Sequence, residues 1–143
     1  MDHTLGDLQS LHEINLAPDC LDDPIGFIRL VRNGISGEVL QQATDRVGHH
    51  ELFACSLGIQ PKQLNRLYQL KNLSPHDSES VLDLLRLFRD LIHTFGSLAT
   101  ANDWLSSILP ALDNRRPADI CDTFAGRSLV RSTIRKIESG YFS

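Results

Sequence analysis

The sequence predicts an all-α protein, in which a helix-turn-helix part comes before a small helical C-terminal part. Nearly all apolar residues repeat at helical spacing, and no stretch alternates apolar and polar residues for long enough to indicate a strand. Residues 51–67 also have the spacing of a helix-turn-helix. A chain of 143 residues suits one domain of ordinary size, or one compact domain that carries a small appendage.

The composition excludes several classes of protein. Hydrophobic residues make up 41% of the chain and charged residues 22%, which is typical of a globular protein and not of a disordered or fibrous one. We expect neither a membrane span nor secretion, because no apolar stretch is long enough and the chain does not open with a signal sequence. The 3 cysteines include no C-x-x-C pair, which argues against a disulfide framework and indicates a reducing cytoplasm.

Residues 1–24 are predicted to form an acidic N-terminal arm. Pro18 and Pro24 interrupt any helix there, so we expect the arm to be mobile or loosely docked. Two short helices should follow, separated by Asn33-Gly34, a pair that suits the end of a helix.

The helix-turn-helix lies within a domain that we place at residues 25–96. A small residue, Ala54, stands where the two helices should cross, and Gly58 supplies the positive φ of the turn. Pro61 sits in the first turn of the second helix, where a missing N–H has no cost.

The second helix of this motif is the candidate DNA-recognition element. Its outward-facing polar residues are predicted to be Gln60, Lys62, Asn65, Arg66 and Gln69. Amide and basic side chains suit base edges and phosphates, so the sequence predicts binding to operator DNA. The net charge of -4 favours the alternative, a plain helical hairpin with a solvated polar face, although residues 60–71 contain bases and no acid.

The longest helix should begin at Ser74-Pro75 and end at Gly96. Its apolar residues cover well over half of its circumference, so it is either central to the core or shares its surface with a partner. We therefore predict a homodimer, also because operators read by single helix-turn-helix units are usually bound by two-fold dimers.

Residues 97–143 are predicted to form the C-terminal domain. Ser97 should cap a short helix that contains Trp104, which is either a core anchor or a binding hot spot. We expect Phe124 to face inward and a last helix to begin at Ser128.

The last helix brings three basic residues into one stripe. Arg127, Arg131 and Arg135 recur every four residues, so they share a face that either binds a partner or is simply solvated.

No catalytic or metal-binding constellation is recognised. The 6 histidines are scattered without a metal-ligand spacing, and no glycine-rich phosphate loop occurs. Cys55 is expected to be a small buried thiol and not a nucleophile. We expect a protein that is not an enzyme and that needs neither a cofactor nor a metal.

Short motifs follow one another in a fixed order through the C-terminal third. They are Trp104-Leu105, Arg116-Pro117-Ala118-Asp119, Thr123, Gly126, Val130, Ile137 and Gly140-Tyr141-Phe142. In this order they resemble the toxin-binding domain of the Xre/MbcA/ParS antitoxin family, and the helix-turn-helix upstream is similar to the Xre-type region that precedes that domain. The chain departs from the family pattern at 113–115, where glycine is common, and at Cys121, where aliphatic residues are frequent.

The resemblance implies an antitoxin of the bacterial cytoplasm. Its partner would be a RES-type toxin, which consumes NAD or transfers from it, and the antitoxin would block the active site of that toxin. The complex would also repress its own operon by binding operator DNA.

The last residues of the sequence suit insertion into the active site of a toxin. Gly140 frees the chain from helical geometry, Tyr141 and Phe142 provide two aromatic anchors, and Ser143 adds a terminal carboxylate. We expect this tail to plug the toxin, with Trp104 and the arginine stripe as further toxin contacts. The alternative is a tail that folds back on its own core.

Two other functions remain open at this point. One is a stand-alone dimeric helix-turn-helix repressor without a toxin, in which the C-terminal third serves dimerisation alone. The other is an adaptor protein whose helix-turn-helix no longer contacts DNA.

Overall fold

The computed structural model describes residues 3–16 and 20–140, and over these ranges it is all-α, as the sequence predicts. The helices are α1 (His3–His12), α2 (Pro24–Asn33), α3 (Gly37–Val47), α4 (His50–Ser56), α5 (Leu64–Tyr68), α6 (Pro75–Phe95), α7 (Leu98–Leu105) and α8 (Phe124–Glu138). Single 3-10 turns form η1 (Pro61–Gln63), η2 (Pro110–Leu112) and η3 (Pro117–Asp119). Within the described ranges there is no strand, and Leu109 and Arg115 form an isolated bridge.

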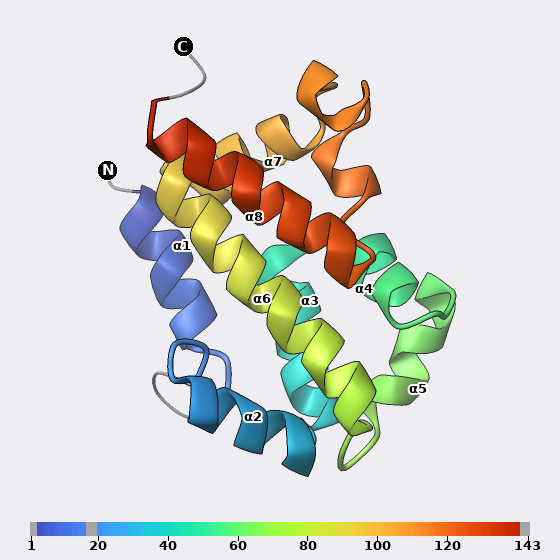
Figure 1. Ribbon diagram of the computed structural model, residues 1–143. Helices are drawn as coiled ribbons and strands as arrows, with labels where there is room; N and C mark the ends of the chain where they lie inside the picture. Colours follow the sequence, from blue (N-terminus) through green and yellow to red (C-terminus); the bar gives the residue numbers. More distant parts are fainter. Residues whose placement is uncertain (1–2, 17–19, 141–143) are drawn as a thin grey trace.

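The central element is α6, which runs diagonally through the molecule (Figure 1). It begins where the sequence predicts, with Pro75 in its first turn and the Asp77 backbone N donating a hydrogen bond to Ser74 Oγ at 3.1 Å. Helices α1, α2, α3, α4, α7 and α8 all pack against it. The apolar residues between positions 81 and 92 are therefore buried within one chain, and a second copy is not needed to cover them.

The N-terminal segment contains a docked helix, so the expectation that prolines interrupt any helix there is wrong for His3–His12. Helix α1 lies along α6 (Figure 1), and the Leu98 backbone N donates a hydrogen bond to Asp7 Oδ2 at 2.7 Å. Just beyond α1, Glu13 forms an ion pair with Arg46 of α3 at 2.7 Å. The expectation failed because the first proline of the sequence is Pro18, and the residues of α1 all precede it.

The last helix also begins earlier than expected. It starts at Phe124 and not at Ser128, because Thr123 Oγ1 accepts a hydrogen bond from the Gly126 backbone N at 2.9 Å and so caps the helix. Phe124, expected to face inward, is 67% exposed.

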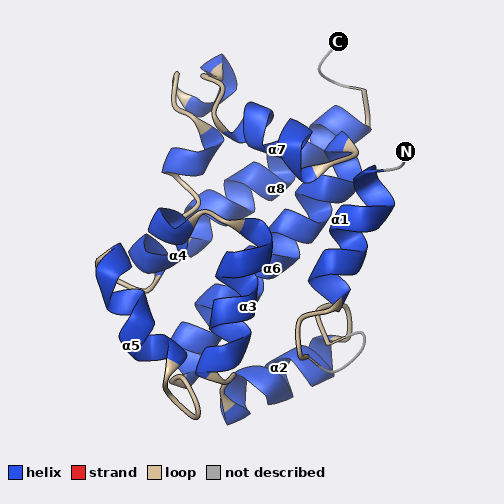
Figure 2. Cartoon of the chain, turned by 180° about the vertical axis from the view of Figure 1, so that it is seen from behind, coloured by secondary structure: helices blue, strands red, loops and turns tan. Residues whose placement is uncertain are grey.

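One hydrophobic core joins the two parts of the chain. Phe53 of α4, Phe88 of α6, Leu105 of α7 and Val130 of α8 belong to the same buried cluster. Figure 2 shows α6 from behind, with α3 lying beside it. The predicted boundary after Gly96 therefore falls at a turn between helices and not at a gap between two cores.

Candidate functional site

Helices α4 and α5 form the predicted helix-turn-helix at one edge of the molecule (Figure 2). The turn closes because Gly58 adopts a φ of 70° and the Ile59 backbone N donates a hydrogen bond to the Ala54 carbonyl at 3.0 Å. Ala54 and Leu64 are buried beneath the motif, as their positions predict. The second element is shorter than expected, since it consists of the 3-10 turn η1 followed by α5.

All the side chains predicted to face outward on this element are exposed, namely Gln60, Lys62, Asn65, Arg66 and Gln69. Lys62 and Arg66 form no ion pair with any residue that the structure describes, so both charges face solvent. Contact of these residues with DNA stays a prediction.

The interface between α6 and α8 contains a buried ion cluster centred on Asp83 of α6. Arg127 Nε donates to Asp83 Oδ2 at 2.6 Å, and Arg131 Nη2 donates to Asp83 Oδ1 at 2.5 Å. Arg86 adds a third hydrogen bond to the same carboxylate at 2.9 Å. A second guanidinium nitrogen of Arg127 donates to the Cys121 carbonyl at 2.9 Å. This cluster ties α8 to α6.

Burial and the neighbouring arginines shift the pKa of Asp83 in opposite directions. Burial raises its pKa and is the largest single effect, but the hydrogen bonds from Arg127 and Arg86 and the attraction of Arg131 together outweigh it. The pKa of Asp83 is therefore below its ordinary value, and the carboxylate is charged at neutral pH. Sequence reasoning missed this residue, although a lone aspartate between Leu82 and Leu84 on an apolar helix was a usable signal.

The arginine stripe is consequently divided between the core and the surface. The side chain of Arg127 is 5% exposed, so its prediction as a surface contact is wrong. Arg131 is 17% exposed, and Arg135 is exposed. Helical periodicity placed the three on one face, but it could not show that α6 covers the N-terminal part of that face.

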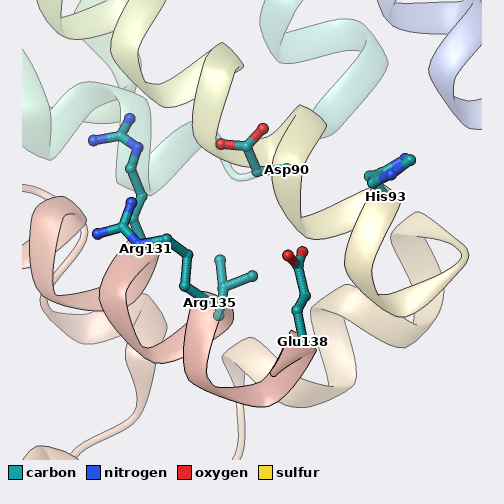
Figure 3. Close-up of a pocket in the computed structure, with 6 residues that line it drawn as sticks. Asp90, His93, Arg131, Arg135 and Glu138 are labelled. Carbon is teal, nitrogen blue, oxygen red and sulfur yellow. The ribbon is translucent and has the colours of Figure 1, made fainter. Parts of the chain in front are cut away.

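A polar groove of about 280 Å³ lies between α6 and α8 (Figure 3). Its lining residues are Asp90 and His93 of α6, and Arg131, Ile134, Arg135 and Glu138 of α8. Thr94 donates a hydrogen bond to Glu138 across one end. Because charges of both signs line it, the groove suits the polar surface of a protein better than a free anion.

A second groove, of about 430 Å³, is almost wholly apolar. It lies between α8 on one side and α7 with η2 on the other, and its lining residues are Trp104, Leu109, Pro110, Ala111, Thr133 and Ile137. Trp104 is half-buried and packs against Phe95, with ring centroids 5.1 Å apart. Trp104 packs against the core, as the first interpretation from the sequence expects, and its role as a binding hot spot stays a prediction.

The candidate toxin-plugging tail lies at the end of α8. Gly140 has a φ of 79°, and its backbone N donates a hydrogen bond to the Ile137 carbonyl at 3.0 Å, so the helix ends there. Tyr141, Phe142 and Ser143 are outside the described residues.

A third hollow, of about 570 Å³, separates α4 from residues 118–122. Cys55 lines it and is exposed, which corrects the expected buried thiol. Its Sγ lies 3.7 Å from Asp122 Oδ2. Desolvation and the Asp122 carboxylate both raise the pKa of Cys55, which favours the protonated thiol.

The described residues offer little else that suggests chemistry. No three His, Cys, Asp or Glu side chains among them gather into a site that would hold a metal ion. None of the helices in the described ranges combines the length and hydrophobicity that crossing a membrane requires.

Two comparisons with known proteins bear on these surfaces. Residues 90–140 match the family described as the antitoxin Xre/MbcA/ParS C-terminal toxin-binding domain. The chain is also similar to the Prs ADP-ribosylating antitoxin of Sphingobium sp. (strain YBL2), with 30% identity over 132 residues that cover 84% of this chain and 82% of the relative. The family match begins at Asp90 within α6, so it includes both grooves that α8 helps to form.

Proposed function

Because this chain belongs to the Xre/MbcA/ParS family of antitoxins, which neutralise a toxin and are not enzymes, we propose that it blocks the active site of a RES-type toxin that consumes NAD. The observation that carries the proposal is the family match over residues 90–140, which contains α7, α8 and the surfaces beside them. The name of the relative joins an antitoxin to ADP-ribosylation, a reaction that takes its ADP-ribose from NAD, and this supports an NAD-using toxin.

The proposed toxin-binding surface is the exposed end of α8 with the tail beyond it. Arg135 faces solvent there, and Gly140 releases the chain from the helix. Tyr141 and Phe142 then supply two large apolar anchors with few rotatable bonds to immobilise.

Removal of the tail is expected to abolish neutralisation. A chain that lacks residues 141–143 should fold, because these residues follow the last helix, but it should not protect cells that express the toxin. Tyr141→Ala alone should cost about 2 kcal/mol of binding free energy if the ring is a hot spot. Growth of cells that co-express the two proteins, with antitoxin level checked by immunoblot, measures the effect.

The matched control removes apolar surface elsewhere. Ile25 and Ile28 of α2 are 60% and 43% exposed, so an Ile25→Ala, Ile28→Ala double variant should protect cells as well as the unchanged chain. Undiminished protection by the tail-less chain would place inhibition on another surface, with Trp104 and Arg135 the next residues to substitute.

We also propose that the antitoxin represses its own operon through the helix-turn-helix. A Lys62→Ala, Arg66→Ala double variant should weaken operator binding in a gel-shift assay, with a smaller salt dependence. Arg66→Ala alone should cost about 1 to 3 kcal/mol if the guanidinium reads a guanine. An Arg29→Ala, Arg32→Ala variant removes two charges from α2 and is the control. Equal operator affinity in the double variant and its control would exclude this helix from the DNA interface. Absence of operator binding by the unchanged chain would favour the adaptor function.

The protein is further proposed to be a homodimer. Burial of the apolar face of α6 within one chain removes one of the two reasons for this proposal, and the two-fold symmetry of operators remains. One chain has a mass of 16.0 kDa. Light scattering of the toxin-free antitoxin at micromolar concentration should give twice that mass. A mass equal to that of one chain would contradict the proposal.

The remaining alternative, a stand-alone repressor without a toxin, does not fit membership of an antitoxin family. A toxin that consumes cellular NAD acts in the cytoplasm of a bacterium, and we place neutralisation in the same compartment.

A further inference from the structure

The apolar groove between α7 and α8 is unusual because almost nothing polar faces it. The hydroxyl of Thr133, the one polar side-chain group besides the indole in its lining, donates a hydrogen bond to the Leu129 carbonyl of its own helix at 2.9 Å. Thr133 therefore contributes mainly its methyl group. An apolar hollow of about 430 Å³ that offers so few hydrogen-bonding partners favours an apolar occupant over water.

The chain itself supplies an occupant within reach. Ile137 lines the groove, and the turn at Gly140 follows only three residues later. The positive φ of Gly140 directs the chain away from the helix axis, and nothing described lies within 4 Å of the position where a Cβ would stand. Three extended residues span about 10 Å, about twice the rise of one helical turn, so residues 141–143 are long enough to fold back beside Ile137 of the groove lining.

The chemistry of this segment also fits the groove. Tyr141 and Phe142 are consecutive aromatic residues, and Trp104 in the wall offers a ring against which another ring can pack. Outside the groove each of the two side chains would leave a large apolar surface in water.

We propose that, in the toxin-free antitoxin, the aromatic tail formed by Tyr141 and Phe142 docks into this groove of its own chain. The groove then shields the tail from solvent until the toxin takes it. Docking concerns the free protein and does not depend on the toxin. Only its consequence rests on the function proposed above, namely that the groove and the toxin compete for the tail. The apparent affinity for toxin is then reduced in proportion to the fraction of chains whose tail is free.

Trp104 is the single tryptophan of the chain, so its fluorescence reports on the groove. We compare acrylamide quenching of the free full chain with that of a Tyr141→Ala, Phe142→Ala variant. The quenching constant should rise about twofold or more in the variant, with a red-shifted emission maximum, because an occupant excludes solvent from the lining of a groove. Phe124→Ala removes an exposed aromatic ring from the other end of α8 and should leave the quenching constant unchanged.

A second variant tests the groove and not the tail. Ala111→Leu fills part of the groove from its exposed wall, so adding the two tail substitutions to this background should no longer change quenching. Equal quenching of the full chain and of the tail variant in the original background would overturn the proposal, since the groove would then be open in the free protein. A difference that vanishes on dilution would also overturn it, because it would identify a second copy as the source of the occupant.

Discussion

Replacing Asp83 by alanine is expected to lower the free energy of unfolding by about 3 to 5 kcal/mol. The substitution leaves Arg127, whose side chain is 5% exposed, buried without the carboxylate that neutralises it. Arg131 and Arg86 lose the same partner. An unpaired buried charge is costly because the guanidinium has given up its hydration without gaining a counter-ion. Urea unfolding followed by circular dichroism measures the loss.

Asp90 of the same helix provides the matched control. Its side chain is 40% exposed and pairs with Arg89, so Asp90→Ala should cost about 1 kcal/mol or less. Similar losses for the two alanine variants would contradict the role given to Asp83.

Acid adds an independent signature of the same carboxylate. The folded-state pKa of Asp83 is depressed, so its contribution to stability is complete above the ordinary value of 3.8 and is lost as the pH falls through the lower folded-state value. An Asp83→Asn variant should lack this part of the acid destabilisation.

Gly126→Ala is expected to destabilise the protein by about 3 kcal/mol or more. A Cβ at this position would stand 1.6 Å from the Ile120 carbonyl oxygen, which belongs to the backbone and cannot rotate away. Relief would require α8 to move from the segment before it, and the Thr123 cap, which binds the Gly126 backbone N, would be lost with that movement. Thermal unfolding measures the change.

Gly6 is the control for this substitution. It lies in α1, is exposed, and has nothing described within 4 Å of the place that an alanine methyl group would occupy, so alanine there should be neutral or stabilising by up to about 1 kcal/mol. Equal melting temperatures for the two alanine variants would show that the close approach at Gly126 is not required.

The parts of the fold that the sequence predicted correctly depend on local signals. The start of α6 follows from Ser74 and Pro75, and its end from Gly96, because caps and helix breakers act within one turn. The turn of the helix-turn-helix follows in the same way from Gly58. The start of α8 was missed although Thr123 was a local signal of the same kind.

The parts that were missed depend on contacts distant in the sequence. Asp83 and Arg127 are 44 residues apart, and no local pattern connects a carboxylate on one helix with a guanidinium on another. The apolar groove is likewise formed by α7, η2 and α8 together, so its walls exist only after these elements have packed. Periodicity identifies which residues share a face of a helix, but neighbouring helices decide which part of that face stays exposed.

The continuity of α6 affects how the protein is degraded. This helix packs against α2, α3 and α4 in one half and against α7 and α8 in the other, so neither half keeps its core if α6 unwinds. Cleavage after Gly96 would leave each fragment with an uncovered apolar surface. A protease that unfolds the chain from either end would thus remove the helix-turn-helix and the antitoxin domain together. We therefore expect the two halves of the protein to be degraded together.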